Sequence, residues 1–299
     1  MTIHDLIKVA EKKLKNSTSP VLDGEVLLSF VIRKPREYLL ANPRRNVNPK
    51  FEKIYFRLIN KRLLGWPVAY LTKHKEFFGL NFYVDKNVLI PRPETEGLVE
   101  RVIDYVNNYV IKKQLNILDV GTGSGCIIIS LAKNLGRKNH YLASDISPRA
   151  INIAKKNAKL HKTKVTFGDG NLLEPWLVRR NPRSIATTAV SRVSGGGGDM
   201  KFDIIVANLP YLKRESDPST KFEPKGALIA AKKGTMLYEE LFKQTSSLTS
   251  LPSSLFIEIG RDQGPIIKKV AKKYLPNYKP QIYKDLFGRT RYASMQKVN

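Results

Sequence analysis

The sequence is poor in the residues that build covalent cross-links and metal sites. Its 299 residues include one cysteine, Cys126, and four histidines. A single cysteine excludes an internal disulfide and a cysteine-based metal site. The histidines, His4, His74, His140 and His161, show no ligand-like spacing, so the sequence predicts a protein without a bound metal.

Long apolar runs are also missing. The longest, such as residues 126–131, are far shorter than the roughly 20 residues that cross a bilayer. The first residues, MTIHDLIKVAEKK, lack the apolar core and cleavage site of a signal peptide. With 42% hydrophobic and 26% charged residues, the composition is that of a soluble globular protein, which we expect in the cytoplasm.

Acidic residues are scarce relative to basic ones. There are 26 Asp and Glu against 52 Lys and Arg, which gives a formal net charge of +26. Such an excess favours a polyanionic partner or a partner with an acidic surface. The basic residues are nevertheless spread through every segment rather than gathered in one tract. Charge alone therefore leaves direct contact with nucleic acid open.

Hydrophobic periodicity divides the chain into a helical part and an α/β part. Residues 1–72 carry amphipathic helical stripes, which predict a small all-α domain. Residues 73–92, which alternate over 76–90 and turn at Gly79, predict a β-hairpin linker. In residues 93–299 strands alternate with helices, which is typical of a parallel sheet covered on both faces. The expected strands are residues 116–120, 140–144, 165–167, 202–207 and 255–259, followed by a final pair at 281–283 and 291–294.

Residues 178–200 interrupt this alternation. The segment has no hydrophobic periodicity and contains four consecutive glycines. Its composition predicts a flexible surface insertion. The alternative is a basic arm that a partner orders.

A glycine-rich loop follows the first strand of the α/β part. It consists of Gly121, Thr122, Gly123, Ser124 and Gly125 and leads into a helix. Glycines at such a turn let the backbone approach a ligand closely. Alone the loop is a weak signal, because dehydrogenases and many structural turns share it. The last position of the dinucleotide fingerprint GxGxxG is a cysteine here, which argues against a dinucleotide.

Polar residues at the ends of the next two strands sharpen this signal. Asp145 ends the second strand, 20 residues beyond Gly125, where a carboxylate can accept both ribose hydroxyls of an adenosine. After the third strand, Asn171 offers a polar contact to the adenine amine and Leu172 an apolar contact to its ring. The combination predicts an adenosine ligand without pyrophosphate, of which S-adenosylmethionine is the obvious candidate. An ordinary βα turn and a dehydrogenase are the alternatives.

The tetrapeptide Asn208-Leu209-Pro210-Tyr211 follows residues 202–207, a run typical of a buried parallel strand. Ligands of open α/β sheets bind at this edge. A carboxamide, a rigid backbone carbonyl and an aromatic face are suited to holding a planar NH2 group while its nitrogen attacks. We therefore predict Asn208, Pro210 and Tyr211 as catalytic residues. A proline-terminated strand followed by a turn is the alternative.

Motifs along nearly the whole chain share one resemblance. They are residues 65–71 with 76–80, the segment LIPRPETE at 89–96, the loop at 118–125, residues 222–224, residues 258–260 and residues 285–291. Together they resemble the bacterial protein-(glutamine-N5) methyltransferases that modify peptide-chain release factors. That family places a helical N-terminal domain before a seven-stranded, Rossmann-like methyltransferase domain, so we expect an α/β fold of this kind.

The resemblance implies a reaction and its site. The target would be the side-chain amide nitrogen of the glutamine in the Gly-Gly-Gln motif of release factors, methylated by S-adenosylmethionine. The target NH2 would be held by the Asn208 side chain and the Leu209 carbonyl, with Pro210 and Tyr211 completing the substrate site. Residues 1–72 would recognise the substrate, and we expect a monomer that binds no membrane. The residues implied to bind the cofactor are Gly121, Thr122, Gly123, Ser124, Gly125, Asp145, Asn171, Leu172 and Asn208.

Three positions depart from the family pattern and keep alternatives open. Leu209 replaces a usual proline, Lys73 a usual glycine, and Asn171 an acidic residue that often contacts adenine. A leucine such as Leu209 is common in the rRNA adenine dimethylases. Because adenine N6 is also a conjugated planar NH2, an adenine-amino methyltransferase acting on rRNA or DNA is the main alternative. A non-catalytic cofactor-binding scaffold is a third.

Overall fold

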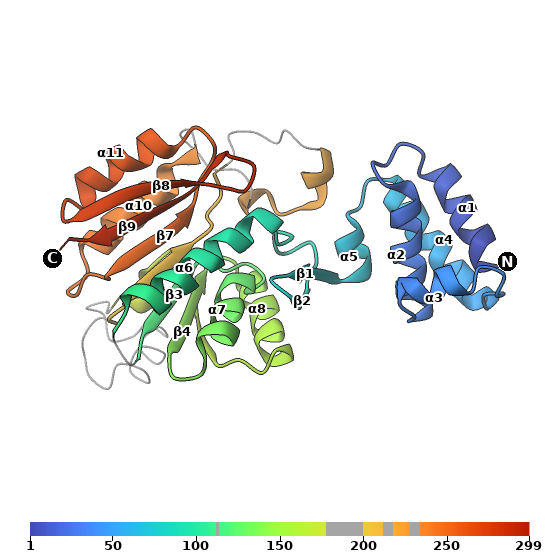
Figure 1. The fold of residues 1–299 in the computed structure, drawn as a ribbon, viewed down its shortest axis with the longest axis horizontal. Helices are drawn as coiled ribbons and strands as arrows, with labels where there is room; N and C mark the ends of the chain where they lie inside the picture. Colours follow the sequence, from blue (N-terminus) through green and yellow to red (C-terminus); the bar gives the residue numbers. More distant parts are fainter. Residues whose placement is uncertain (112–113, 178–199, 212–217, 228–233, 299) are drawn as a thin grey trace. The chain divides into compact units, whose positions relative to one another are not determined.

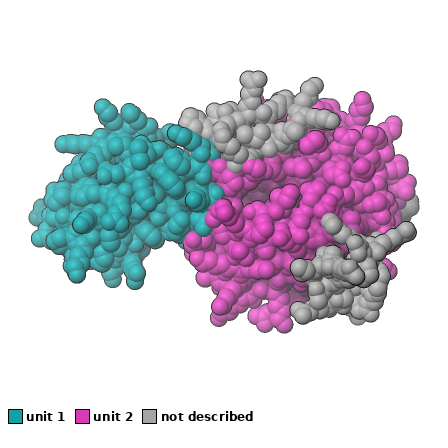
Figure 2. All heavy atoms as spheres, turned by 180° about the vertical axis from the view of Figure 1, so that it is seen from behind, with its two compact units in different colours: residues 1–74, 84–86, 216–222 teal, residues 75–83, 87–215, 223–299 magenta. Residues whose placement is uncertain are grey.

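The computed structural model describes residues 1–111, 114–177, 200–211, 218–227 and 234–298. The chain forms two compact units (Figure 2). Unit 1 comprises Met1–His74, Val84–Lys86 and Ser216–Phe222, and unit 2 comprises Lys75–Tyr83, Asn87–Glu215 and Glu223–Asn299.

The segment expected as an insertion lies almost wholly outside the described residues. Residues 178–199 are not described, but Met200 is. Its side chain is 4% exposed and packs in a core cluster of unit 2. The prediction was wrong for Met200, because burial of its side chain makes it a core residue.

The helices of unit 1 pack around one apolar cluster. Buried residues of all five helices meet there, including Leu6, Leu28 and Tyr55, and the Tyr55 hydroxyl donates to the Gly24 carbonyl at 3.2 Å. The first helix begins with a capping box, in which Thr2 and Asp5 satisfy each other's backbone N–H groups. The helices are α1 (Ile3–Lys13), α2 (Pro20–Ile32), α3 (Arg36–Ala41), α4 (Pro49–Leu63) and α5 (Val68–Thr72).

Lys73 ends helix α5 in a left-handed conformation, with φ at 59°. Glycine reaches this region without the steric cost that a Cβ imposes. This conformation explains why a glycine would suit the position. Lys73 adopts it nonetheless.

A β-hairpin follows. Strands β1 (His74–Phe77) and β2 (Leu80–Tyr83) pair on either side of a turn at Gly79. The alternating pattern predicted strand as far as residue 90, but strand pairing ends at Tyr83. Beyond it, Val84 and Val88 are buried without joining a sheet, so their periodicity reflects burial rather than pairing.

Unit 2 is built on a seven-stranded sheet whose strand order is β5-β4-β3-β6-β7-β9-β8 (Figure 1). The first five strands in this order run parallel, and β9 pairs antiparallel with both β7 and β8. The predicted α/β fold with a seven-stranded, mostly parallel sheet is confirmed. The strands are β3 (Asn116–Val120), β4 (His140–Asp145), β5 (Val165–Asp169), β6 (Ile204–Ala207), β7 (Ser254–Glu258), β8 (Tyr278–Lys284) and β9 (Thr290–Lys297).

Alternate residues of the central strands point into two separate cores. In β6, Ile205 and Ala207 belong to one cluster, while Ile204 and Val206 belong to the other. Since both faces of each strand are apolar, both faces must be covered.

Helices lie on both faces of the sheet, as Figure 1 shows. Buried residues of α6 (Glu96–Tyr109), α7 (Cys126–Leu135) and α8 (Pro148–Leu160) join one core, and those of α10 (Met236–Ser246) and α11 (Gly264–Tyr274) join the other. Short 3-10 turns complete the described elements: η1 (Pro93–Thr95), η2 (Glu174–Trp176), η3 (Pro218–Phe222) and η4 (Lys225–Ala227). Among the described helices, none has the length and apolar character needed to span a membrane.

The strand order reverses direction beside β3. From β3 the chain adds β4 and β5 on one side, and then returns to place β6 on the other. Val120 and Ala207, the last residues of β3 and β6, are register partners. The loops that follow these strands therefore start side by side, at the position where open α/β sheets bind ligands.

Asn157, on helix α8, connects the hairpin to the glycine-rich loop. Its side chain is fully buried; its Oδ1 accepts from the Tyr83 N–H at 2.8 Å, and its Nδ2 donates to the carbonyls of Tyr83 at 3.0 Å and Ser124 at 2.8 Å. We expect Asn157→Ala to lower the free energy of unfolding by about 1–3 kcal/mol, because buried backbone groups lose these partners. Chemical denaturation measures the change.

Asn134→Ala is the matched control for this substitution. Asn134 lies exposed on α7, and its Nδ2 donates to one backbone carbonyl, that of Ser130, at 2.8 Å. The expected change is within about 0.5 kcal/mol. Equal losses for the two variants would contradict a special role for Asn157.

Candidate active site

A cavity of about 550 Å³ opens at the carboxyl edge of the sheet in unit 2. Most of the predicted site residues line it, and these come from four loops. Gly125 and Tyr211 do not line it. The predicted residues in the wall are Gly121, Thr122, Gly123, Ser124, Asp145, Asn171, Leu172, Asn208, Leu209 and Pro210.

The glycine-rich loop needs glycine for two different reasons. Gly121 has φ at 74°, and a Cβ there would lie 2.7 Å from Leu209 Cδ2. Gly125 has φ at 81°, and a Cβ there would lie 3.0 Å from Ile129 Cδ1 and 3.2 Å from Ala154 Cβ. Conformation and close packing together therefore exclude larger residues at both ends of the loop.

Asp145 fixes the loop from the neighbouring strand. Its Oδ2 accepts from the Gly123 N–H at 2.9 Å, and its Oδ1 accepts from the Ser147 N–H at 2.9 Å. Burial raises the pKa of the Asp145 carboxyl, and the two backbone hydrogen bonds oppose that rise. Each oxygen keeps a further lone pair for a ligand in the cavity.

Asp119 is a buried carboxyl that the sequence analysis did not single out. Its Oδ2 accepts from the Thr122 hydroxyl at 2.6 Å, while Oδ1 has no partner among the described residues. Burial raises the pKa of Asp119 to about 7, and the charge of Asp145 adds to the rise. A charged residue at the last-but-one position of a buried strand is the sequence signal that could have identified it.

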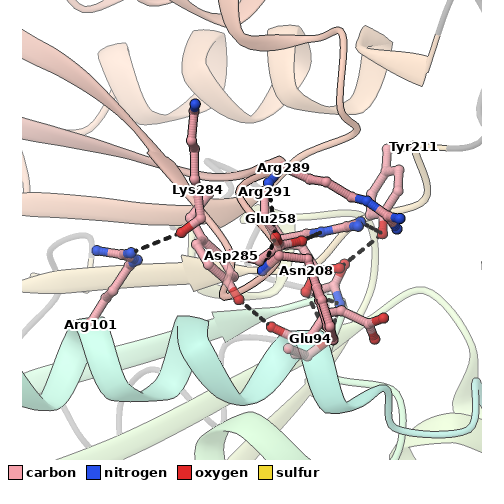
Figure 3. A network of polar contacts seen from close by, with 12 residues as sticks. Glu94, Arg101, Asn208, Tyr211, Glu258, Lys284, Asp285, Arg289 and Arg291 are labelled. Atoms are coloured by element: carbon pink, nitrogen blue, oxygen red, sulfur yellow. Dashed lines mark hydrogen bonds and ion pairs between the residues drawn. The ribbon is translucent and has the colours of Figure 1, made fainter.

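The Asn208 side chain belongs to a buried polar network (Figure 3). Its Nδ2 donates to Thr95 Oγ1 and to Glu258 Oε2, both at 3.0 Å, and no described residue donates to its Oδ1. Thr95 Oγ1 also donates to Glu258 Oε2, at 2.7 Å. Asn208 and Thr95 line the cavity, whereas Glu258 is 1% exposed and is not part of its wall.

Tyr211 is held by the same carboxylate. Its hydroxyl donates to Glu258 Oε1 at 2.9 Å and accepts from Arg291 Nη1 at 3.2 Å (Figure 3). Burial, followed by the charge of Glu258, raises the pKa of the Tyr211 hydroxyl, so Tyr211 is neutral at ordinary pH. Burial also raises the pKa of Glu258, but the hydrogen bonds from Thr95 and Tyr211 and the charge of Arg291 oppose the rise.

Leu209, which stands where the family pattern has a proline, is held by both its side chain and its backbone. Its side chain is 4% exposed and contributes to a core cluster. Its backbone N–H, which a proline would lack, donates to the Tyr238 hydroxyl at 3.1 Å. That hydroxyl also donates to the Glu258 carbonyl, so Leu209 is tied into strand β7.

Glu223 holds one wall of the cavity in place. Its Oε2 accepts from the Ile90 N–H at 3.1 Å, and its Oε1 accepts from Arg92 Nη2 at 2.6 Å. Since the Glu223 side chain is 1% exposed, loss of Arg92 would leave a buried carboxylate without its charged partner. The wall formed by residues 87–92 is thereby joined to Pro224, which also lines the cavity.

Metal ligands are not grouped in the described part of the chain. Within it, no set of three or more His, Cys, Asp or Glu side chains is arranged to hold a metal ion. The polar side chains of the cavity wall are instead one carboxylate, that of Asp145, together with amides, hydroxyls and Arg92, and such a mixed lining suits an organic ligand.

Comparisons with known proteins identify the class of protein to which this fold and this cavity belong. Residues 111–247 match the family described as Methyltransferase domain, so this is a methyltransferase with a Rossmann-like domain, and S-adenosylmethionine is the methyl donor that such a domain implies. Residues 5–72 match the family described as PrmC N-terminal domain. The chain belongs to the release factor glutamine methyltransferases, to whose members it is similar over nearly its whole length.

Two relatives and one solved structure illustrate the similarity. The release factor glutamine methyltransferase of Bacillus cereus is 31% identical, covering 99% of this chain and 100% of its own. That of Clostridium acetobutylicum is 34% identical over 90% of both chains. The hMettl16 catalytic domain, solved in complex with MAT2A 3'UTR hairpin 6, covers 81% of this chain and 82% of its own with a TM-score of 0.53. At 14% identity the latter shows a shared fold alone.

The raised pKa of Asp119 predicts a pH-dependent stability. In the folded state the carboxyl keeps its proton up to about pH 7, whereas the unfolded chain releases it near the ordinary value of 3.8. The contribution of Asp119 is therefore complete below pH 3.8 and is lost as the pH rises to about 7. The slope inside this window is roughly 1.4 kcal/mol per pH unit.

Asp119→Asn isolates this contribution, because asparagine does not titrate. We expect the free energy of unfolding of the native protein to fall relative to that of the variant across the window, and the difference to stay constant above it. Urea denaturation at a series of pH values measures both. A difference that does not change with pH would contradict the assignment.

Proposed function

We propose that the protein methylates the side-chain amide nitrogen of the glutamine in the Gly-Gly-Gln motif of peptide-chain release factors, using S-adenosylmethionine. The observation that carries the proposal is the placement of Asn208. Its carboxamide lies in the wall of the cavity beside the glycine-rich loop, and no described residue occupies its Oδ1. Family membership supplies the substrate class.

The lining of the cavity supports it as the site for the adenosyl part of the cofactor. Gly121 permits close approach of the backbone, since a Cβ there would already collide with Leu209. Asp145 is oriented by two backbone N–H groups and would accept the ribose hydroxyls. Asn171 and Leu172 line the same cavity and would contact the adenine, and Thr122, Gly123, Ser124 and Asn208, which also line it, would complete the site. Gly125, the remaining predicted cofactor residue, would act through the shape of the loop.

The chemical problem for the protein is a weak nucleophile. A glutamine amide nitrogen has its lone pair delocalised into the carbonyl, and S-adenosylmethionine supplies an electrophilic methyl group. Asn208 Oδ1 and the Leu209 carbonyl would accept the two N–H groups of the target amide and hold its nitrogen towards that methyl. Such positioning can lower a barrier by about 7–11 kcal/mol in well-oriented systems.

Pro210 and Tyr211 would restrict the acceptor further. Pro210 lines the cavity and limits the backbone freedom of the loop. Tyr211, fixed by Glu258 and Arg291 through its hydroxyl, would pack its ring against the target amide. No base is required in this scheme, because the nitrogen becomes acidic once it is methylated and can release its proton afterwards.

The helical unit would recognise the protein substrate. Its support is the match of residues 5–72 to the PrmC N-terminal family, within the all-α part predicted over 1–72. Residues 73–92 would act as a linker to the methyltransferase domain at 93–299. A cytoplasmic location and a monomeric state belong to the same proposal.

Methyl transfer from labelled S-adenosylmethionine tests the substrate. We expect label in purified release factor, and mass spectrometry of the digest should place it on the glutamine of the Gly-Gly-Gln peptide. Ribosomal RNA and DNA are assayed in parallel, since adenine N6 presents the same planar NH2 and the net charge of +26 favours polyanions. Label in nucleic acid and none in release factor would overturn the proposal in favour of an adenine-amino methyltransferase.

Two substitutions separate the acceptor site from the cofactor site. Asn208→Ala should lower kcat by roughly 100- to 1,000-fold, as loss of one oriented hydrogen-bonding group does in other enzymes. Its Kd for S-adenosylmethionine should change by less than about threefold. Asp145→Ala should instead raise that Kd by about 10- to 100-fold, since one charged acceptor contributes about 1.5–3 kcal/mol. Near-normal kcat in Asn208→Ala would assign the tetrapeptide a structural role.

A further inference from the structure

A carboxamide can serve as an acceptor only if its oxygen faces the ligand. Rotation by 180° about the last side-chain bond exchanges Oδ1 and Nδ2 of Asn208 with little change in shape. In the rotated form an NH2 group would face the NH2 of the target, and neither could accept. The site therefore needs a device that selects one of the two orientations.

We propose that Glu258 and Thr95 are positioning residues that fix the orientation of the Asn208 carboxamide, so that its Oδ1 faces the acceptor NH2. The proposal rests on the function proposed above for this site. Both residues lie in segments that carry the family resemblance, 89–96 and 258–260, but neither was predicted to be a site residue, and Glu258 does not reach the cavity wall. Its action on the substrate would thus pass through Asn208.

The direction of each hydrogen bond follows from the chemistry of the groups. An ionised carboxylate only accepts, so the close contact between Thr95 Oγ1 and Glu258 Oε2 uses the single proton of the threonine hydroxyl. The hydroxyl oxygen can then only accept from Asn208. Both neighbours of Asn208 Nδ2 are consequently acceptors, each at 3.0 Å.

The rotated carboxamide would be penalised by both neighbours at once. Its oxygen would face Glu258 Oε2, which has no proton, and Thr95 Oγ1, whose single proton is already donated to Glu258. Since Glu258 is 1% exposed, water would not relieve the conflict. An unmatched pair of buried acceptors costs several times RT, which is enough to make one orientation dominant.

Burial of a carboxylate is itself unfavourable, and the surrounding groups offset it. Glu258 accepts three hydrogen bonds, from Thr95, Asn208 and Tyr211, and Arg291 lies close enough for its charge to act on the carboxylate. These groups favour the ionised form that the orientation requires. The same carboxylate holds the Tyr211 hydroxyl, so one group orders both side chains of the acceptor site.

The proposal gives a physical role to the LIPRPETE segment. Thr95 is the last residue of η1 and is 3% exposed, directly before helix α6. The 3-10 turn begins at Pro93, and the Thr95 N–H donates to the Arg92 carbonyl at 3.0 Å. The segment thus places the Thr95 hydroxyl between Asn208, which follows β6, and Glu258, the last residue of β7. Both partners lie far from Thr95 in the sequence.

Two pairs of variants test the proposal in steady-state methylation of release factor. Thr95→Val keeps the shape of the side chain but removes its hydroxyl, whereas Thr95→Ser keeps the hydroxyl. We expect Thr95→Val to lower kcat by roughly 10- to 100-fold and Thr95→Ser to stay within about threefold of the native rate. Glu258→Leu should resemble Thr95→Val or be slower. Ser254→Ala, at a buried hydroxyl on the same strand with no partner among the described residues, should leave kcat unchanged.

A double-mutant cycle distinguishes positioning from an independent role. In the Asn208→Ala background there is no carboxamide left to orient, so Thr95→Val should lower kcat by less than about twofold. Calorimetry should show that the Kd for S-adenosylmethionine changes by less than about threefold in both backgrounds. The same fold-loss in both backgrounds, or a native rate in Thr95→Val, would overturn the proposal.

The controls distinguish a failure of this inference from a failure of the proposed function. If thermal melting shows that Glu258→Leu does not fold, the two Thr95 variants still test the proposal. If the native protein transfers no label to release factor, the proposed function fails and this inference fails with it. If the native protein transfers label and the cycle is additive, only the orienting role fails.

Discussion

The site depends on one pairing, the parallel alignment of β3 with β6. Because Val120 and Ala207 are register partners, the glycine-rich loop and the Asn208 tetrapeptide leave the sheet side by side. Leu209 then packs against Gly121 so closely that no Cβ would fit. A shift of this register by one residue would displace the acceptor loop from the cofactor loop by about 3.3 Å and would exchange the two cores into which the side chains of one strand point.

The acceptor loop is also anchored from the other side, by β7. Glu258 ends that strand, and its carboxylate accepts hydrogen bonds from Asn208, Tyr211 and Thr95. Its backbone carbonyl accepts from the Tyr238 hydroxyl. Buried carboxylates are expensive in a core. Glu258 and Asp119, near the carboxyl ends of the two strands that flank β6, are exceptions of the kind that functional sites contain, where local stability is given up for an arranged set of polar groups.

Much of the fold could be predicted from the sequence, because strong apolar runs separated by helical patterns leave few arrangements other than a covered parallel sheet. The prediction of strands and loops failed at two places where the local sequence pattern does not reveal why a residue is buried. Residues 84–90 continue the alternation because Val84 and Val88 are buried, not because they pair in a sheet. Met200 closes a glycine-rich segment yet packs in the core. Neither result is visible in local periodicity, since both depend on distant segments.

The sequence by itself determined the class of the protein, through the glycine loop, the carboxylate after the second strand and the Asn208 tetrapeptide, whose chemistry is local. Only the tertiary structure decided how Asn208 is held. Thr95, Asn208 and Glu258 are separated by 113 and 50 residues along the chain, and they meet because strand order and helix placement bring three chain segments to one edge. A hydrogen bond acts over about 3 Å, so the spacing of these residues in the sequence could not indicate that they are bonded to one another.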